Sequence, residues 1–228
     1  MQYYEVVRES LVSTARNLTT KGYLMATGGN LSVRVPDGHD MLITPSNSDY
    51  MTMQPKDICQ LDQELRQREG PLPPSVESAM HSAIYRMRPD VMAIIHTHQV
   101  YASAVSLTGK GIPALFDEQA RFLGRTIELI PYAPSGTASL ARLVARRVRS
   151  RNNAYLMQNH GAICFGLTLE RAVHNVEILE KCALAWLLSL CTSQTTTRIP
   201  LVVREVAFAK LKADYEKHNT EPSFIAQE

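Results

Sequence analysis

The sequence predicts one α/β domain in which a mixed, mainly antiparallel sheet carries helices on its faces. Two observations indicate this fold class. Strand-like segments are mixed with segments of helical periodicity, and the first two predicted strands lie close enough to form a hairpin, unlike a regular strand–helix–strand succession. A chain of 228 residues, 45% hydrophobic and 20% charged, suits one large globular domain. We therefore expect residues 1–228 to form a single domain with a helical tail from about residue 195.

Five segments place apolar side chains on one helical stripe. Gly22 follows the first segment in the way that commonly ends a helix. Ser75, Ser135 and Thr168 each precede a later segment and can cap it, and Pro89 stops the second helix. The predicted helices cover residues 3–21, 75–87, 136–149, 169–190 and 202–218.

Short apolar or alternating runs predict the strands. The first two, LSVRV and MLIT, flank a turn at Pro36–His39 and form the expected hairpin. The run VMAIIHTH follows Pro89 and Asp90 directly, and AYLMQNHGAICF is expected to be one strand with Gly161 inside it. The predicted strands cover residues 31–35, 41–44, 57–62, 91–98, 126–130 and 154–165.

Composition and charge exclude several classes of protein. The net charge of +2 is too small to indicate a nucleic acid or an anionic membrane as partner. No apolar run reaches the roughly 18 residues that a membrane span needs. The N-terminal segment has no basic start followed by an apolar block, so we expect a cytoplasmic protein. The four cysteines form no CxxC pair and are expected to be small buried hydrophobic residues.

Three histidines are candidate metal ligands. Alternate residues of a strand point to the same face, so His96 and His98 project together at the end of their strand. His160 follows 62 residues later, beside a glycine. Three histidines leave one coordination position open, which is the pattern of catalytic rather than structural zinc. In isolation, the first pair reads equally well as half-buried histidines at a sheet edge, and His160 as a hydrogen-bonded core residue.

Glu77 is the candidate acid/base. It lies in the first turn of the predicted helix that begins at Ser75, where the helix dipole favours an anion. That dipole is itself a sufficient explanation for a lone carboxylate. His81 lies four residues on, so the two side chains can pair on the surface, and His81 is a weaker alternative metal ligand.

Three polar segments suggest an anion site. TGGN at 27–30 contains two glycines that allow backbone N–H groups to point at one spot. TPSNS at 44–48 directly follows a strand, and Ser75 begins a helix. A tight turn and an ordinary helix cap are the alternative readings. The chain has neither a GxxxxGK[ST] nor a GxGxxG pattern, so nucleotide binding is not indicated.

Taken together, the chain resembles the class II aldolase/adducin family, of which the fuculose-1-phosphate aldolases are representatives. The resemblance covers about residues 5–190 and rests on ordered matching segments, namely TGGNLSVR, MLITPSNSDY, PPSVESAMHSAIYRMRPDVMAIIHTHQVYASAVS, YAPSGTASLA and YLMQNHGAICFG. It implies a three-layer α/β/α fold with a mostly antiparallel central sheet. It also implies a homotetramer with its active sites between subunits.

The resemblance also assigns roles to residues of this chain. His96, His98 and His160 would hold one divalent metal per subunit, with zinc expected and manganese, cobalt or iron as alternatives. Glu77 would ligate the metal at rest and act as acid/base when substrate displaces it. The phosphate of the substrate would bind to small polar residues, namely Thr27, Gly28, Gly29, Asn30, Ser46, Asn47 and Ser75.

The implied reaction is cleavage of a ketose 1-phosphate to dihydroxyacetone phosphate and an aldehyde. The substrate would be like fuculose 1-phosphate, or like 5-deoxy- or 5-methylthio-ribulose 1-phosphate. Two positions depart from the aldolase pattern, because Asn47 stands where glycine is usual and Val76 where a second serine is usual. Related decarboxylases, dehydratases and epimerases, and the non-enzymatic adducins, are the alternatives. The epimerases carry aspartate at the position of Glu77, and adducin-like domains lose the metal histidines.

The tail supplies one further candidate. Its apolar residues recur at near-helical spacing, and Tyr215 is the only tyrosine after Tyr155. The resemblance implies that a tail tyrosine from a neighbouring subunit protonates the aldehyde oxygen, which makes Tyr215 the candidate general acid. Packing of the tail helix on its own subunit is the alternative.

Overall fold

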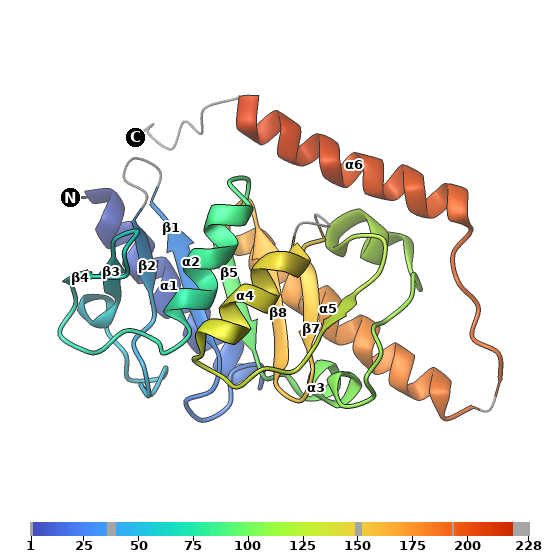
Figure 1. Cartoon of the computed structure of the whole chain (residues 1–228), viewed down its shortest axis with the longest axis horizontal. Helices are drawn as coiled ribbons and strands as arrows, with labels where there is room; N and C mark the ends of the chain where they lie inside the picture. The colour runs from blue at the N-terminus through green and yellow to red at the C-terminus, as the bar shows by residue number, and fades with distance from the viewer. Residues whose placement is uncertain (1, 36–39, 149–151, 193, 221–228) are drawn as a thin grey trace.

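The computed structural model describes residues 2–35, 40–148, 152–192 and 194–220 (Figure 1). Its centre is one eight-stranded sheet in the order β4-β3-β2-β1-β5-β8-β7-β6. Every neighbouring pair is antiparallel except β6 and β7. The predicted fold class is therefore confirmed. The strands are β1 Asn30–Arg34, β2 Met41–Ile43, β3 Cys59–Leu61, β4 Gln67–Glu69, β5 Ala93–Thr97, β6 Glu128–Ile130, β7 Ala154–Met157 and β8 Gly161–Gly166.

Helices cover both faces of this sheet. Figure 1 places α2 and α4 over one face, with α1 and α5 behind the other. The sequence patterns predicted every helix given below except α3 and the two short helical turns. The helices are α1 Gln2–Thr20, α2 Ser78–Met87, α3 Val100–Ser106, α4 Ala138–Arg147, α5 Leu169–Leu190 and α6 Leu201–Thr220, with short turns η1 Pro55–Asp57 and η2 Gln119–Leu123.

Two apolar clusters, one on each face, make up the core. Ile95 of β5 packs in the cluster that also contains Leu11 of α1 and Leu179 of α5. The preceding residue, Ile94, packs in the other cluster with Ile84 of α2. Successive strand residues alternate between faces, so β5 is buried on both sides. The next residue on the Ile94 side is His96, which therefore faces the α2 layer.

The segment 154–165 differs from the prediction of one strand. It forms two antiparallel strands, β7 and β8, with Met157 opposite Gly161. Between them, Asn159 adopts a φ of 54°, a left-handed conformation that asparagine tolerates better than most residues. His160 consequently lies in a tight turn and not within a strand. The apolar residues before and after it hid this turn, because both strands are buried along their whole length.

The starts of α2 and α4 also differ from prediction. Ser75 forms a turn before α2, and Glu77 is the residue immediately before the helix. In α4 the capping oxygen belongs to Thr137, which accepts from the backbone N–H of Leu140, and not to Ser135. Several hydroxyl residues close to a helix start are interchangeable as caps in sequence, so spacing alone does not select between them.

The tail helix α6 packs against its own chain in this structure. Phe208, Leu211 and Tyr215 form a small buried cluster with Leu167. No helix in the described part of the chain combines the length and apolar character needed to cross a membrane. The expected hairpin turn at Pro36–His39 lies outside the described residues.

Candidate metal centre

His96 is positioned by the centre of the sheet. It lies on β5 opposite Asn30 of β1 and Ile163 of β8, and its side chain is fully buried. Its Nδ1 is 2.8 Å from the carbonyl oxygen of Ala162. A carbonyl only accepts, so Nδ1 carries the proton and Nε2 keeps its lone pair. This arrangement leaves the imidazole ready to bind a metal through Nε2.

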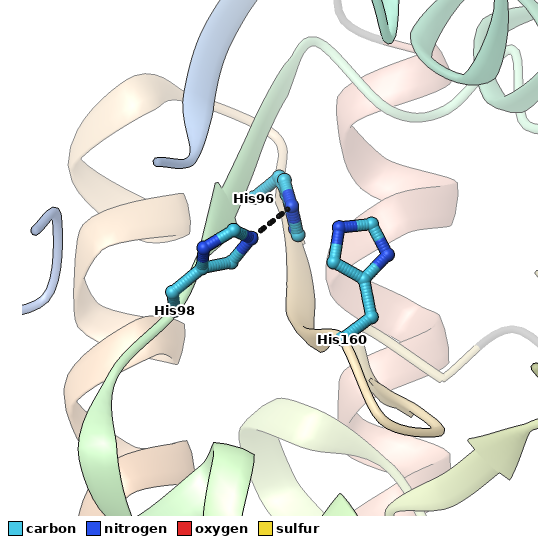
Figure 2. Close-up of side chains that lie close together, drawn as sticks. All are labelled: His96, His98 and His160. Atoms are coloured by element: carbon cyan, nitrogen blue, oxygen red, sulfur yellow. Dashed lines mark hydrogen bonds between the residues drawn. The ribbon is translucent and has the colours of Figure 1, made fainter. Parts of the chain in front are cut away.

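His98 and His160 bring their rings to the same point (Figure 2). His98 follows the end of β5, and His160 projects from the turn between β7 and β8. One ligand atom from each of the three histidines lies within 4.8 Å of the others. Nε2 of His98 is only 3.0 Å from Nε2 of His96. The sequence prediction that these three side chains converge agrees with this geometry.

Two glycines make room for the ring of His98. A β-carbon at Gly28 would lie 2.6 Å from Nδ1 of His98, and one at Gly161 would lie 2.8 Å from its Cδ2. Both distances are shorter than any ordinary contact, so a side chain at either position would displace the ring. Gly28 and Gly161 therefore serve the histidine cluster through close packing, in addition to any role in an anion site.

Glu77 completes the cluster from the start of α2. Its side chain is 4% exposed. Oε2 accepts a hydrogen bond from Nδ2 of Asn30 at 2.9 Å and lies 3.2 Å from Nε2 of His96. Oε1 accepts from the hydroxyl of Ser135 at 2.9 Å and lies 3.4 Å from Nε2 of His160. The carboxylate is thus held against two histidines by two uncharged donors.

The protonation states of these groups suit a metal site. Burial raises the pKa of Glu77, but His96, Asn30, His160 and Ser135 together outweigh it and lower that pKa to about 2. Burial also lowers the pKa of His96 to about 4 and lowers the pKa of His98. At neutral pH the carboxylate is ionised and these imidazoles are neutral, as metal ligands must be. The three nitrogens and the adjacent oxygen fit a divalent cation.

His81 does not join this cluster. Its side chain is fully buried, so the surface pair with Glu77 suggested by their spacing is absent. Nδ1 of His81 is 2.7 Å from the hydroxyl of Ser32, which also lies 2.8 Å from the hydroxyl of Tyr85. Burial lowers the pKa of His81 to about 3. His81 is therefore a neutral core residue in a hydrogen-bonded group behind Glu77.

The predicted phosphate loops are partly assembled. Thr27 and Gly28 lie in the loop beside His98, but the N–H of Gly28 donates to the carbonyl of Met25. Ser46 lies against the segment before Ser75, and its N–H donates to the carbonyl of Pro73. These two N–H groups are therefore not free donors. None of these backbone contacts involves the Ser46 hydroxyl.

The remaining phosphate candidates have identified positions. The side-chain amide of Asn30 is committed to Glu77, and the hydroxyl of Ser75 accepts from the N–H of Glu77. Gly29 and Asn47 have φ values of 85° and 52°. Asparagine is among the non-glycine residues that most readily adopt this left-handed conformation, which explains how it replaces the glycine usual at position 47.

Tyr215 lies away from the histidines of its own chain. Its side chain is buried, and its hydroxyl donates to Oδ1 of Asn153 at 2.7 Å. Asn153 directly precedes β7, whereas His160 follows the other end of that strand. Burial raises the pKa of the Tyr215 hydroxyl, so its proton is held tightly. This placement favours the alternative in which the tail tyrosine serves packing.

Sequence comparisons give one consistent result. The family model for the "Class II Aldolase and Adducin N-terminal domain" matches residues 9–187. The L-fuculose phosphate aldolase of Escherichia coli is 36% identical over 198 residues, covering 86% of this chain and 87% of the relative. The 5-methylthioribulose-1-phosphate/5-deoxyribulose-1-phosphate aldolase of Rhodospirillum rubrum is 39% identical over 181 residues, covering 79% and 80%.

Solved structures agree with these matches. The structure of an L-fuculose 1-phosphate aldolase is similar with a TM-score of 0.83 and 30% identity, over 90% of this chain and 96% of that chain. The structure of the L-fuculose-1-phosphate aldolase from Thermus thermophilus has a TM-score of 0.71 and 27% identity, over 86% and 100%. The similarity thus extends over nearly the whole of each protein.

Proposed function

The chain belongs to the class II aldolase and adducin family and is a class II aldolase, and from this premise we propose that it cleaves a ketose 1-phosphate to dihydroxyacetone phosphate and an aldehyde. The observation that carries the proposal is the contact of the Glu77 carboxylate with both His96 and His160. That contact joins a proton-transfer group to a metal-binding group. The relatives that act on fuculose, methylthioribulose and deoxyribulose phosphates support this class of substrate.

The histidines are proposed to hold one zinc ion per subunit. Class II aldolases use a divalent metal, and three imidazole nitrogens beside a carboxylate are typical zinc ligands. When bound, the metal supplies a positive charge that stabilises negative charge developing on substrate oxygens. The retained histidines and the ionised carboxylate argue against a purely structural role of the adducin kind.

Glu77 is proposed to move the proton at carbon. In the condensation direction, its carboxylate accepts a proton from the hydroxymethyl carbon of dihydroxyacetone phosphate. The C–H electron pair then moves towards the carbonyl oxygen, and the carbon becomes the nucleophile that attacks the aldehyde. In cleavage the same carboxyl group returns the proton to that carbon. Glu77 is almost fully buried, so its orientation is set by the side chains around it.

The substrate class can be tested directly with a panel of ketose 1-phosphates. We expect release of dihydroxyacetone phosphate from at least one of the fuculose, rhamnulose, ribulose, 5-deoxyribulose and 5-methylthioribulose 1-phosphates. A coupled assay with glycerol-3-phosphate dehydrogenase measures this release. The matching unphosphorylated ketoses should be cleaved at least about tenfold more slowly, because the hydroxyls of Ser46 and Ser75 and the loop at 27–30 are proposed to bind the phosphate.

Inorganic phosphate serves as the control for that pocket. It should inhibit competitively, since it occupies the same donors as the ester. Equal turnover of phosphorylated and free ketose, without inhibition by phosphate, would contradict the phosphate site. If the enzyme instead decarboxylates or dehydrates its substrate and releases no dihydroxyacetone phosphate, the aldolase proposal itself is wrong.

We propose that the protein is a homotetramer, and Tyr215 tests whether the tail contributes to a neighbouring site. From its bond to Asn153 we expect Tyr215→Phe to lower the free energy of unfolding by about 1 kcal/mol and to change turnover less than about twofold. Thermal unfolding and kcat, measured on the same sample with its mass determined by light scattering, check this. A large loss of kcat with unchanged stability and metal content would instead make Tyr215 the general acid.

A further inference from the structure

We propose that Ser135 is the positioning residue that fixes the Glu77 carboxylate for proton transfer. The inference rests on the proposed role of Glu77 and adds a residue that the sequence patterns suggest only as a helix cap. Three features of the structure carry it, namely the arrangement of donors around the carboxylate, the rigidity of the loop that bears Ser135, and the hydrogen-bonding capacity of a hydroxyl.

The donors are divided evenly between the two carboxylate oxygens. Oε2 accepts from Asn30 and lies beside His96, whereas Oε1 accepts from Ser135 and lies beside His160. A glutamate carboxylate held at only one oxygen can still rotate about χ3, because the distribution of this torsion angle is broad. The second donor, Ser135, therefore defines the plane of the carboxylate relative to the histidines.

The loop that carries Ser135 is held on both sides of it. Thr137 caps α4 and also donates its hydroxyl to the carbonyl of Pro134 at 2.6 Å. Gly136 lies beside Val76 and has a φ of 71°, a left-handed conformation that glycine adopts without strain. Since Thr137 supplies the helix cap, the hydroxyl of Ser135 is left to bind Glu77. The loop thus brings a hydroxyl 58 residues away to a fixed position on the carboxylate.

A hydroxyl suits this position better than an amide. The side-chain nitrogen of Asn30 can only donate, so it can serve Oε2 only while that oxygen carries no proton. The hydroxyl of Ser135 can donate to an ionised carboxylate and accept from a protonated one. Ser135 can therefore keep its hydrogen bond whether or not Oε1 carries the proton. Ser135 itself is exposed, so it lies at the accessible side of the buried carboxylate.

The test compares Ser135→Ala with Ser135→Thr, which keeps a hydroxyl, and with Ser10→Ala as a control on α1, where the Ser10 hydroxyl donates to the carbonyl of Val6. The readouts are kcat, KM, metal content, and the exchange of the hydroxymethyl hydrogen of dihydroxyacetone phosphate for solvent deuterium by NMR. For Ser135→Ala we expect kcat and the exchange rate to fall about tenfold, with KM within about twofold and full metal content. Ser135→Thr should recover most of the loss, and Ser10→Ala should behave like the parent protein.

A crystal structure of the metal-free Ser135→Ala variant supplies a readout that does not depend on activity. We expect the carboxylate to rotate away from His160 in this variant and to keep its place in Ser135→Thr. An unchanged kcat and carboxylate position, a rise in KM alone, or loss of metal would each overturn the proposal. If the parent protein neither exchanges deuterium nor cleaves any ketose phosphate, the proposed function fails, whereas parent activity with an unaffected alanine variant contradicts only the role of Ser135.

Discussion

Replacing His96, His98 or His160 with alanine is expected to remove the bound metal and to lower turnover by about 10³-fold or more. Each histidine is one of only three nitrogens in the cluster, and its loss leaves too few protein ligands for a tightly held ion. The charge stabilisation that a metal supplies is several kcal/mol, which corresponds to a change of this size in rate. Metal content by atomic absorption and turnover of the preferred ketose 1-phosphate measure the two effects.

The three variants are not equivalent in their effect on folding. His96 is fully buried between β1 and β8, so its truncation leaves a cavity and removes the hydrogen bond to the carbonyl of Ala162. His160 lies in a turn and is 11% exposed, so His160→Ala should unfold close to the parent temperature. His174→Ala is the matched control, because that histidine is exposed on α5 and packs on Phe122. Full metal occupancy in any of the three cluster variants would remove that residue from the ligand set.

The substitution Glu77→Gln is expected to retain the metal and to reduce kcat roughly 10²-fold or more. Glutamine keeps the size of the side chain and one carbonyl oxygen, so the contacts with Asn30 and the histidines are largely preserved. It cannot accept the proton from carbon, and the step that depends on this proton is lost. Deuterium exchange into dihydroxyacetone phosphate should fall by the same factor, because it needs the same proton transfer.

A second carboxylate provides the control for Glu77. Glu128 of β6 is half-buried and accepts a side-chain hydrogen bond from Asn152 at 3.0 Å, as Glu77 does from Asn30. Glu128→Gln should keep turnover within about twofold of the parent, because a neutral amide can still accept that bond. Turnover near the parent value in Glu77→Gln would mean that this carboxylate only stabilises the start of α2. Loss of metal in that variant would show that Glu77 is needed as a ligand.

Local patterns predicted the elements that are buried on one side only or whose ends are marked by capping or turn residues. The helices 3–21 and 169–190 were expected within one residue of α1 and α5, and Thr168 is the cap of α5, accepting from the N–H of Arg171. The hairpin of β1 and β2 was likewise expected, from the turn residues at 36–39 that separate its two strands. The turn between β7 and β8 was missed, because both strands are buried on both faces and leave no polar interruption except the Gln158–His160 turn itself.

Within the site, the sequence alone predicted the relative positions of residues that belong to the same strand or the same turn. His96 and His98 share a face because strand residues alternate, and Gly161 allows a close approach whatever the rest of the fold does. The assignment of His81 was less secure, since helical spacing relates it to Glu77 but does not state whether that face is buried. In the structure that face packs on β1, and His81 binds Ser32.

Only the tertiary structure decided which distant groups meet. The contacts of Glu77 with Asn30, Ser135 and the histidines join segments separated by tens of residues, and each depends on the order of strands in the sheet. Caps and turns are chosen in the same way, since Ser135 and Thr137 are equally good caps in sequence and the contact with Glu77 separates their roles. Local periodicity specifies which face of an element is buried. It does not specify the neighbour, because that choice is made by the packing energy of the whole sheet and its two helical layers.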